Sequence, residues 1–239
     1  MKKLFAANWK MHGDLNAVAE WAARFSPPPA CDVVFCPPFP YLAAARAALP
    51  KSVAVGAQTL FGGAREGAHT GEVSARMLAD IGCRYALVGH SERRAAGESS
   101  ADCAAQIAAA AAAGLSPILC VGETEAQRER ADETVARQLR ALKTLPPGAP
   151  CAVAYEPVWA IGSGKTPSAE DLARRRAAIR QWLISQKGAV GGKIRILYGG
   201  SIKAENADLL DRAGMDGGLA GGASLDAAVF LRICRTSAG

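Results

Sequence analysis

Short, almost continuously apolar runs recur along the chain, separated by polar, glycine-rich or proline-containing segments. Eight of them have the length and composition of strands: LFAANW (4–9), DVVFC (32–36), SVAVGAQ (52–58), YALVGH (85–90), PILCVG (117–122), CAVAYE (151–156), IRILYGG (194–200) and GGLAGG (217–222). Runs without alternating polar and apolar residues are typical of strands buried on both faces, as in a parallel sheet covered by helices. The pattern therefore predicts eight parallel strands.

Stretches with helical composition alternate with these runs, for example residues 15–25, 101–113, 125–142 and 169–186. Eight strand and helix units within 239 residues fit a (β/α)8 barrel, or TIM barrel, whose usual size is about 250 residues. No linker rich in Pro, Gly or Ser divides the chain, so residues 1–239 are expected to form a single catalytic domain. An open, doubly wound sheet is the structural alternative, but no G-x-G-x-x-G follows its first strand.

Polar residues and glycines gather where the predicted strands end. The positions concerned are Asn8 and Lys10 after the first run, His90, Ser91 and Glu92 after the fourth, Glu156 after the sixth, Gly199, Gly200 and Ser201 after the seventh, and Gly221 and Gly222 after the eighth. In a barrel these ends share one rim, where catalytic groups lie and where phosphate is commonly held after the seventh and eighth strands. The sequence therefore predicts one site on that rim.

The residue types on this rim suit proton transfer beside an anionic group. Glu156 is the candidate base, His90 a hydrogen-bonding partner of a substrate oxygen, and Lys10 a fixed positive charge. Taken singly, each has a structural interpretation as well: a lone histidine is often a hydrogen bonder, and paired glycines often form a turn. The sequence lacks the nucleophile elbow that would indicate a Ser-His-Asp triad. Cys120 is interpreted as a small core residue.

No metal or cofactor is predicted. The three histidines, at positions 12, 69 and 90, lack ligand spacing. The segment GSGKT at 162–166 resembles a nucleotide-binding P-loop, but Trp159 occupies the position of the first glycine that the full motif requires. Pro167 and Ser168 then follow Thr166, so the next helix begins too late to cradle phosphate, with Ser168 as its N-cap.

Composition and charge narrow the choice of partners and compartment. The net charge is +6, but the basic residues are scattered and not interleaved with aromatic residues, which favours small anionic substrates over nucleic acid. Seven cysteines without a C-x-x-C pair favour the reducing cytoplasm over a disulfide framework. Asn8 and Lys10 make the first apolar run too short for a signal peptide, and Gly114, Ser116 and Pro117 interrupt the longest run, so no membrane span is predicted.

Several motifs together resemble the triosephosphate isomerase family across nearly the whole chain. They are ANWKMHG (7–13), GAHTGEVS (67–74), LVGHSERR (87–94), CVGET (120–124), AYEPVWAIGSGKT (154–166), YGGSI (198–202) and GGASL (221–225). The resemblance implies cofactor-free interconversion of dihydroxyacetone phosphate and D-glyceraldehyde 3-phosphate, as in glycolysis and gluconeogenesis. Glu156 matches the family's base, His90 its electrophile, Asn8 and Lys10 its substrate contacts, and Gly162, Ser201, Gly221 and Gly222 its phosphate contacts. Ser91, Glu92 and Cys120 are expected to support them.

The resemblance also implies a lid and a dimer. Residues 157–166 match the family's lid, and residues 58–72, from Gln58 to Glu72, match the loop that reaches into a second subunit and would bring Thr70 near the neighbour's Lys10. His12, His69, Pro167 and Ala220 depart from the family's usual residues, and none removes a proposed catalytic group. Two other interpretations stay open: another sugar-phosphate isomerase or epimerase, and a catalytically inactive barrel that binds sugar phosphates.

Overall fold

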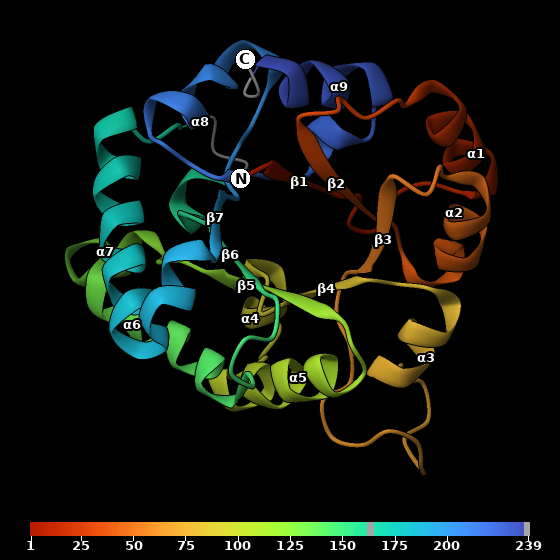
Figure 1. Ribbon diagram of the computed structural model, residues 1–239, viewed down its shortest axis with the longest axis horizontal. Coiled ribbons are helices and arrows are strands. Elements are labelled where there is room, and N and C mark those ends of the chain that lie inside the picture. The colour runs from red at the N-terminus through yellow and green to blue at the C-terminus, as the bar shows by residue number, and fades with distance from the viewer. Residues whose placement is uncertain (162–164, 237–239) are drawn as a thin grey trace.

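A closed barrel of parallel strands forms the centre of the molecule. The structure is a computed structural model, and it describes residues 1–161 and 165–236. Within these residues the strands follow the barrel in sequence order (Figure 1). β8 pairs with β1 to close it, with Leu4 opposite Gly217. The strands are β1 (Lys3–Asn8), β2 (Cys31–Cys36), β3 (Val53–Ala57), β4 (Tyr85–Val88), β5 (Ser116–Val121), β6 (Ala152–Tyr155), β7 (Arg195–Tyr198) and β8 (Gly217–Ala220). The predicted fold class is confirmed.

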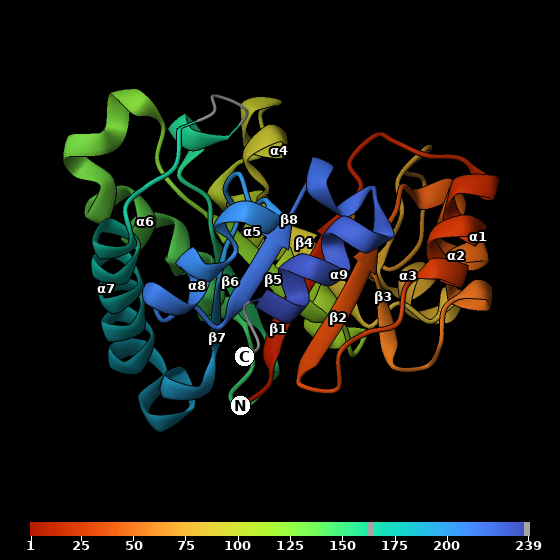
Figure 2. The same ribbon diagram turned by 90° about the horizontal axis from the view of Figure 1, so that it is seen from above.

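The longer helices surround the barrel on its outer side, and the five-residue helix after β4 lies at the rim (Figures 1 and 2). They are α1 (Leu15–Arg24), α2 (Leu42–Ala48), α3 (Ala75–Ile81), α4 (Ser91–Ala95), α5 (Ser100–Ala112), α6 (Ala131–Leu139), α7 (Ala169–Lys187), α8 (Asp208–Arg212) and α9 (Ala227–Thr236). The Ser168 side chain accepts a hydrogen bond from the Asp171 N–H at 3.0 Å and caps α7, as predicted. The GSGKT segment therefore does not lead directly into a helix.

The prediction of one helix over 125–142 is wrong. The structure has a 3-10 helix at Glu125–Arg130, then α6, then a second 3-10 helix at Arg140–Thr144. The break before α6 falls at Arg130, whose φ of −112° and ψ of 29° are not those of an α-helix. Helical composition alone does not distinguish these three segments.

Several strands end earlier than their apolar runs. β4 stops at Val88 because Gly89 has a φ of 67°, a left-handed conformation that cannot continue a strand. β6 stops at Tyr155 and β7 at Tyr198. His90 and Glu156 therefore lie just past the strands, in the loops of the rim. This rim, which also carries α4, is on the side of the barrel away from the N-terminus (Figure 2).

Two layers of core residues hold these strands. The larger layer lies between the barrel and its helices, and the inner layer fills the barrel itself. The inner layer consists of Leu4, Ala6, Val34, Cys36, Leu87, Ile118, Cys120, Ala152, Ala154, Leu197 and Leu219. Burial raises the pKa of the Cys120 thiol well above its ordinary value, so this cysteine is a core residue and a poor nucleophile.

An aromatic cluster between β2, α1 and α9 fixes the loop that follows β8. The Trp21 ring stacks on Phe25 and Phe35, with centroids 4.4 and 4.5 Å apart. The indole N–H groups of Trp21 and Trp9 both donate to the Ser224 carbonyl oxygen, at 2.9 and 3.2 Å. Because Ser224 ends the short 3-10 helix Gly222–Ser224, this packing positions the two glycines of the rim.

Replacing Trp21 by Ala should therefore lower the free energy of unfolding by about 3–5 kcal/mol, the usual loss for a buried tryptophan. The partly buried Trp182 on α7 provides the comparison, and its replacement should have a clearly smaller effect. Urea denaturation of both variants measures the difference. Equal losses would show that the cluster around Trp21 does not contribute more to stability than the surface of α7.

Candidate active site

A cavity of ≈ 430 Å³ opens on the rim and collects most of the predicted site residues. Its lining includes Asn8, Lys10, His90, Glu156, Ser201, Gly221 and Gly222, contributed by the ends of five strands. Ser91 and Glu92 lie beside it on α4, and Cys120 lies below it in the barrel core. Gly162, predicted as a phosphate contact, lies outside the described residues.

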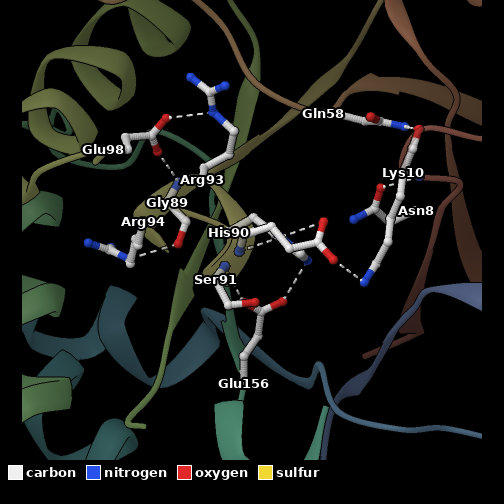
Figure 3. A network of polar contacts seen from close by, with 11 residues as sticks. Asn8, Lys10, Gln58, Gly89, His90, Ser91, Arg93, Arg94, Glu98 and Glu156 are labelled. Atoms are coloured by element: carbon white, nitrogen blue, oxygen red, sulfur yellow. Dashed lines mark hydrogen bonds and ion pairs between the residues drawn. The ribbon is translucent and has the colours of Figure 1, made fainter. Parts of the chain in front are cut away.

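Glu156 is almost fully buried, with 2% of its surface exposed. Its Oε2 accepts a hydrogen bond from the Ser91 backbone N–H at 2.9 Å, and its Oε1 lies 3.2 Å from His90 Nε2 (Figure 3). Burial raises the pKa of the carboxyl, while His90, the Ser91 N–H and Lys10 oppose this shift in that order. A carboxylate with a raised pKa is a stronger base than one in water.

His90 is held in one orientation by the helix that follows it. It is the N-cap of α4, and its Nδ1 accepts a hydrogen bond from the Glu92 backbone N–H at 3.2 Å. A nitrogen that accepts carries no proton, so the ring proton of this neutral tautomer is on Nε2, the atom that faces Glu156. The side chain can therefore donate a hydrogen bond into the cavity.

Lys10 has a left-handed backbone, with a φ of 52° that is otherwise seen only at glycines in the described residues. This conformation costs about 1–3 kcal/mol and is maintained only where the surroundings determine it. The Asn8 Oδ1 accepts from the Lys10 N–H at 3.0 Å, and Lys10 Nζ lies 2.5 Å from Glu92 Oε1. A methyl group at Gly221 would lie 3.2 Å from the Lys10 Cε, so glycine there leaves room for the lysine.

Ser201 connects the loop after β7 with the segment after β6. Its hydroxyl donates to the Ala160 carbonyl oxygen at 3.0 Å. In this arrangement a phosphate contact from Ser201 would come from its backbone N–H, because the hydroxyl proton is already used. The nearby Gly199 has no room for a side chain, because a Cβ there would lie 2.7 Å from the Glu156 Cγ.

The sequence analysis missed Glu123, a second buried glutamate just past a strand. It is 2% exposed, and the Tyr155 hydroxyl lies 2.9 and 3.2 Å from its two carboxylate oxygens. The Trp159 indole N–H donates to Glu123 Oε1 at 2.9 Å, and the Arg128 guanidinium lies 4.2 Å from the centre of the Trp159 ring. A glutamate directly after an apolar run, the signal that identified Glu156, could have identified it.

The sequence analysis also missed Glu98 and Arg94, two side chains that hold the turn before His90. The Gly89 N–H donates to Glu98 Oε1 at 3.0 Å, and Arg94 Nε donates to the Gly89 carbonyl oxygen at 2.8 Å (Figure 3). Arg94 also donates to the Cys120 carbonyl oxygen at 3.2 Å, which joins the ends of β4 and β5. These contacts fix the backbone from which His90 projects.

Within residues 1–161 and 165–236, no cluster of three or more His, Cys, Asp or Glu side chains could hold a metal ion. A search of the same residues for a helix long and apolar enough to cross a membrane finds none.

The fold and the rim define an enzyme of the (β/α)8 class, with a buried carboxylate, an imidazole and a lysine around one cavity. Comparison with known proteins identifies the family to which the chain belongs. The family model described as triosephosphate isomerase matches residues 3–237. The chain belongs to the triosephosphate isomerase family.

Curated relatives cover almost the full length of the chain. A triosephosphate isomerase from Alcanivorax borkumensis is 50% identical, with 98% of each chain covered. The enzyme of the same name from Thiobacillus denitrificans is 51% identical, with 99% of each chain covered. One from Thermus thermophilus is 46% identical over 97% of each chain.

The raised pKa of Glu156 predicts a change in stability with pH. A carboxyl whose pKa is higher in the folded protein stabilises the fold when protonated, below its ordinary value of 4.5, and this contribution is lost as the pH rises through the folded pKa. At neutral pH the ionised side chain therefore destabilises the fold. Replacing Glu156 by Gln should raise the melting temperature at pH 8 by a few degrees and by less at pH 4.

Thermal unfolding of both proteins at several pH values tests this. The exposed Glu125, replaced by Gln, is the control, and its effect on the melting temperature should remain small throughout. A melting temperature for the Glu156 variant that falls below the parent's at pH 8 would contradict the expected sign.

Proposed function

We propose that this protein interconverts dihydroxyacetone phosphate and D-glyceraldehyde 3-phosphate without a cofactor. The observation that carries the proposal is the placement of Glu156 and His90, whose facing atoms lie 3.2 Å apart on one cavity that Lys10 also lines. The choice of triose phosphates as the substrates follows from membership of the triosephosphate isomerase family.

In this reaction Glu156 removes a proton from the carbon next to the substrate carbonyl. The electron pair of the C–H bond forms a C=C bond, and the π pair of the carbonyl group moves to its oxygen, which gives an enediolate that the Nε2–H of His90 stabilises by hydrogen bonding. Glu156 then returns the proton to the neighbouring carbon, and a hydroxyl proton moves between the two oxygens. Atoms and charge balance, so no redox group is needed. The neutral-histidine mechanism is the general one known for this enzyme class.

The phosphate group is the anion that Lys10 faces in this proposal. The backbone N–H groups of Ser201, Gly221 and Gly222 are its further contacts, together with that of Gly162. Ser201, Gly221 and Gly222 line the same cavity as Glu156, which supports the assignment. Ser91 holds the base, and Glu92 pairs with Lys10 until the substrate is bound.

Residues 157–166 form the lid of the site in this proposal. Closure would exclude water and prevent the enediolate from losing its phosphate. The Trp159 contact with Glu123 and the Ala160 contact with Ser201 support a defined position for the first part of the lid. Pro167 restricts the backbone at the other end.

The active form is a cytoplasmic homodimer in this proposal. The segment between β3 and α3, which contains residues 58–72, extends beyond the ring of helices (Figure 1), and residues 65–72 are exposed. Its His69 ring lies 4.5 Å from the Phe61 ring, so the projecting segment has side-chain packing of its own. The seven cysteines are free thiols, which suits a reducing compartment.

An assay of D-glyceraldehyde 3-phosphate isomerisation, coupled to reduction of the ketose product, tests the activity. Replacing Glu156 by Asp should leave the fold unchanged and reduce kcat by about a hundredfold, because a carboxylate misplaced by about 1 Å loses that much rate. The exposed Glu125 replaced by Asp is the control. A kcat for the Glu156 variant within a factor of about three of the parent's would exclude Glu156 as the base.

The dimer is tested by analytical sedimentation. The expected mass is twice the 24.7 kDa of one chain, with the same mass when triose phosphate is turned over. Replacing Thr70 by Arg should shift the protein toward monomer, because an unpaired charge would enter the proposed interface. A parent protein that sediments as a fully active monomer would reject the proposal.

A further inference from the structure

The side chain of Gln58 connects the ends of β1 and β2 behind Lys10, a residue that lines the cavity. Gln58 is the first residue after β3, and its amide nitrogen donates to the Lys10 carbonyl oxygen at 2.8 Å (Figure 3). The same nitrogen donates to the Cys36 carbonyl oxygen at 2.9 Å. Both amide protons are therefore used, one on the segment after β1 and one on the last residue of β2. Gln58 itself does not line the cavity, but Lys10, whose backbone it contacts, does.

Lys10 is thus held at both of its peptide groups. Asn8 accepts from its N–H at 3.0 Å, and Gln58 donates to its carbonyl group at 2.8 Å. Between these two contacts the residue has its left-handed φ of 52°. A strained conformation persists only where neighbouring groups determine it, and these two amides are the groups that do so.

The ammonium end of Lys10 is less firmly held than its backbone. Its side-chain partner is Glu92, which is 57% exposed, and an exposed ion pair contributes little to fixing a long side chain. The direction in which Lys10 leaves the backbone therefore decides where its charge lies. That direction depends on the two peptide groups.

We propose that Gln58 is a positioning residue for Lys10, and that it places the lysine charge where the substrate phosphate binds. This inference rests on the proposed function, because Lys10 faces the phosphate only in that function. The role requires a glutamine: a glutamate has no amide protons and would repel both carbonyl oxygens, and an apolar side chain would leave them unpaired.

A double-mutant cycle tests the proposal. Gln58→Met keeps the length of the side chain and removes its donors, and it is made in the parent and in Lys10→Ala. In the parent it should lower kcat/KM for glyceraldehyde 3-phosphate by about tenfold, mostly through KM. In Lys10→Ala it should lower kcat/KM by less than about twofold, because a residue that acts through Lys10 has nothing left to position.

Two controls separate positioning from general damage. With D-glyceraldehyde, which has no phosphate, Gln58→Met should have activity within about twofold of the parent. Thr144→Val is the matched variant, because the Thr144 hydroxyl also contacts two backbone carbonyl groups, those of Ala104 and Ala141, and lies outside the cavity. It should leave both activities unchanged. Sedimentation at the assay concentration confirms that all variants have the parent's mass.

The same cycle is measured as the dissociation constant of inorganic phosphate by calorimetry, so it does not depend on turnover. Weaker phosphate binding by Gln58→Met only when Lys10 is present supports the proposal even if the parent is inactive on triose phosphates, which would reject the proposed function alone. Equal fold-losses in both backgrounds overturn it. If Gln58→Met does not fold, Gln58→Asn, which keeps the donors but shortens their reach, replaces it under the same criterion.

Discussion

The carboxylate of Glu156 is the charge around which the rim is arranged. A side chain that is 2% exposed has lost most of its water, so its ionised form depends on the hydrogen bonds and charges that replace that water. The Ser91 N–H, the His90 ring and the Lys10 ammonium provide this replacement; the first two come from the start of α4, and Lys10 comes from the segment after β1. Their positions must therefore be fixed together, because a carboxylate with only some of these partners would be destabilised.

Many of the other polar contacts at the rim hold the loops that carry Glu156 and its partners. Gly89, which precedes His90, is held by Glu98 on one side and Arg94 on the other. The start of the segment after β6 is held by Glu123 through Trp159, and by Ser201 through Ala160. Side-chain to backbone contacts dominate, so the loops are connected to one another in addition to the strands that carry them.

The sequence predicted the barrel because apolar runs on both faces of a strand leave few alternatives to a covered parallel sheet. It also placed Asn8, Lys10, His90 and Glu156 on one rim, since parallel strands bring all their carboxyl ends to the same side. The strand ends were less predictable, because Gly89 stops β4 through a backbone conformation that its neighbours' hydropathy does not encode. The break before α6 within 125–142 has the same origin, since Arg130 is a good helix former in a non-helical conformation.

Contacts between residues far apart in sequence were the other limit. Glu123 carries a recognisable signal, a glutamate after an apolar run, whereas Gln58 carries none. Its importance comes from the two carbonyl oxygens within reach, which belong to segments 48 and 22 residues away. The hydropathy pattern along the chain predicts at which end of the barrel a residue lies. It does not predict which residues from other strands contact it there.

Closure of the barrel by its first and last strands also has a consequence for biosynthesis. Leu4 pairs with Gly217, so the sheet has an open edge until almost the whole chain has been synthesised. A ribosome therefore releases the N-terminal strands long before the partner that completes them, and β1 has an unpaired side during that time. The emerging chain must be kept from pairing with other strands, and the rim becomes complete only when β8 and the loop after it have joined β1.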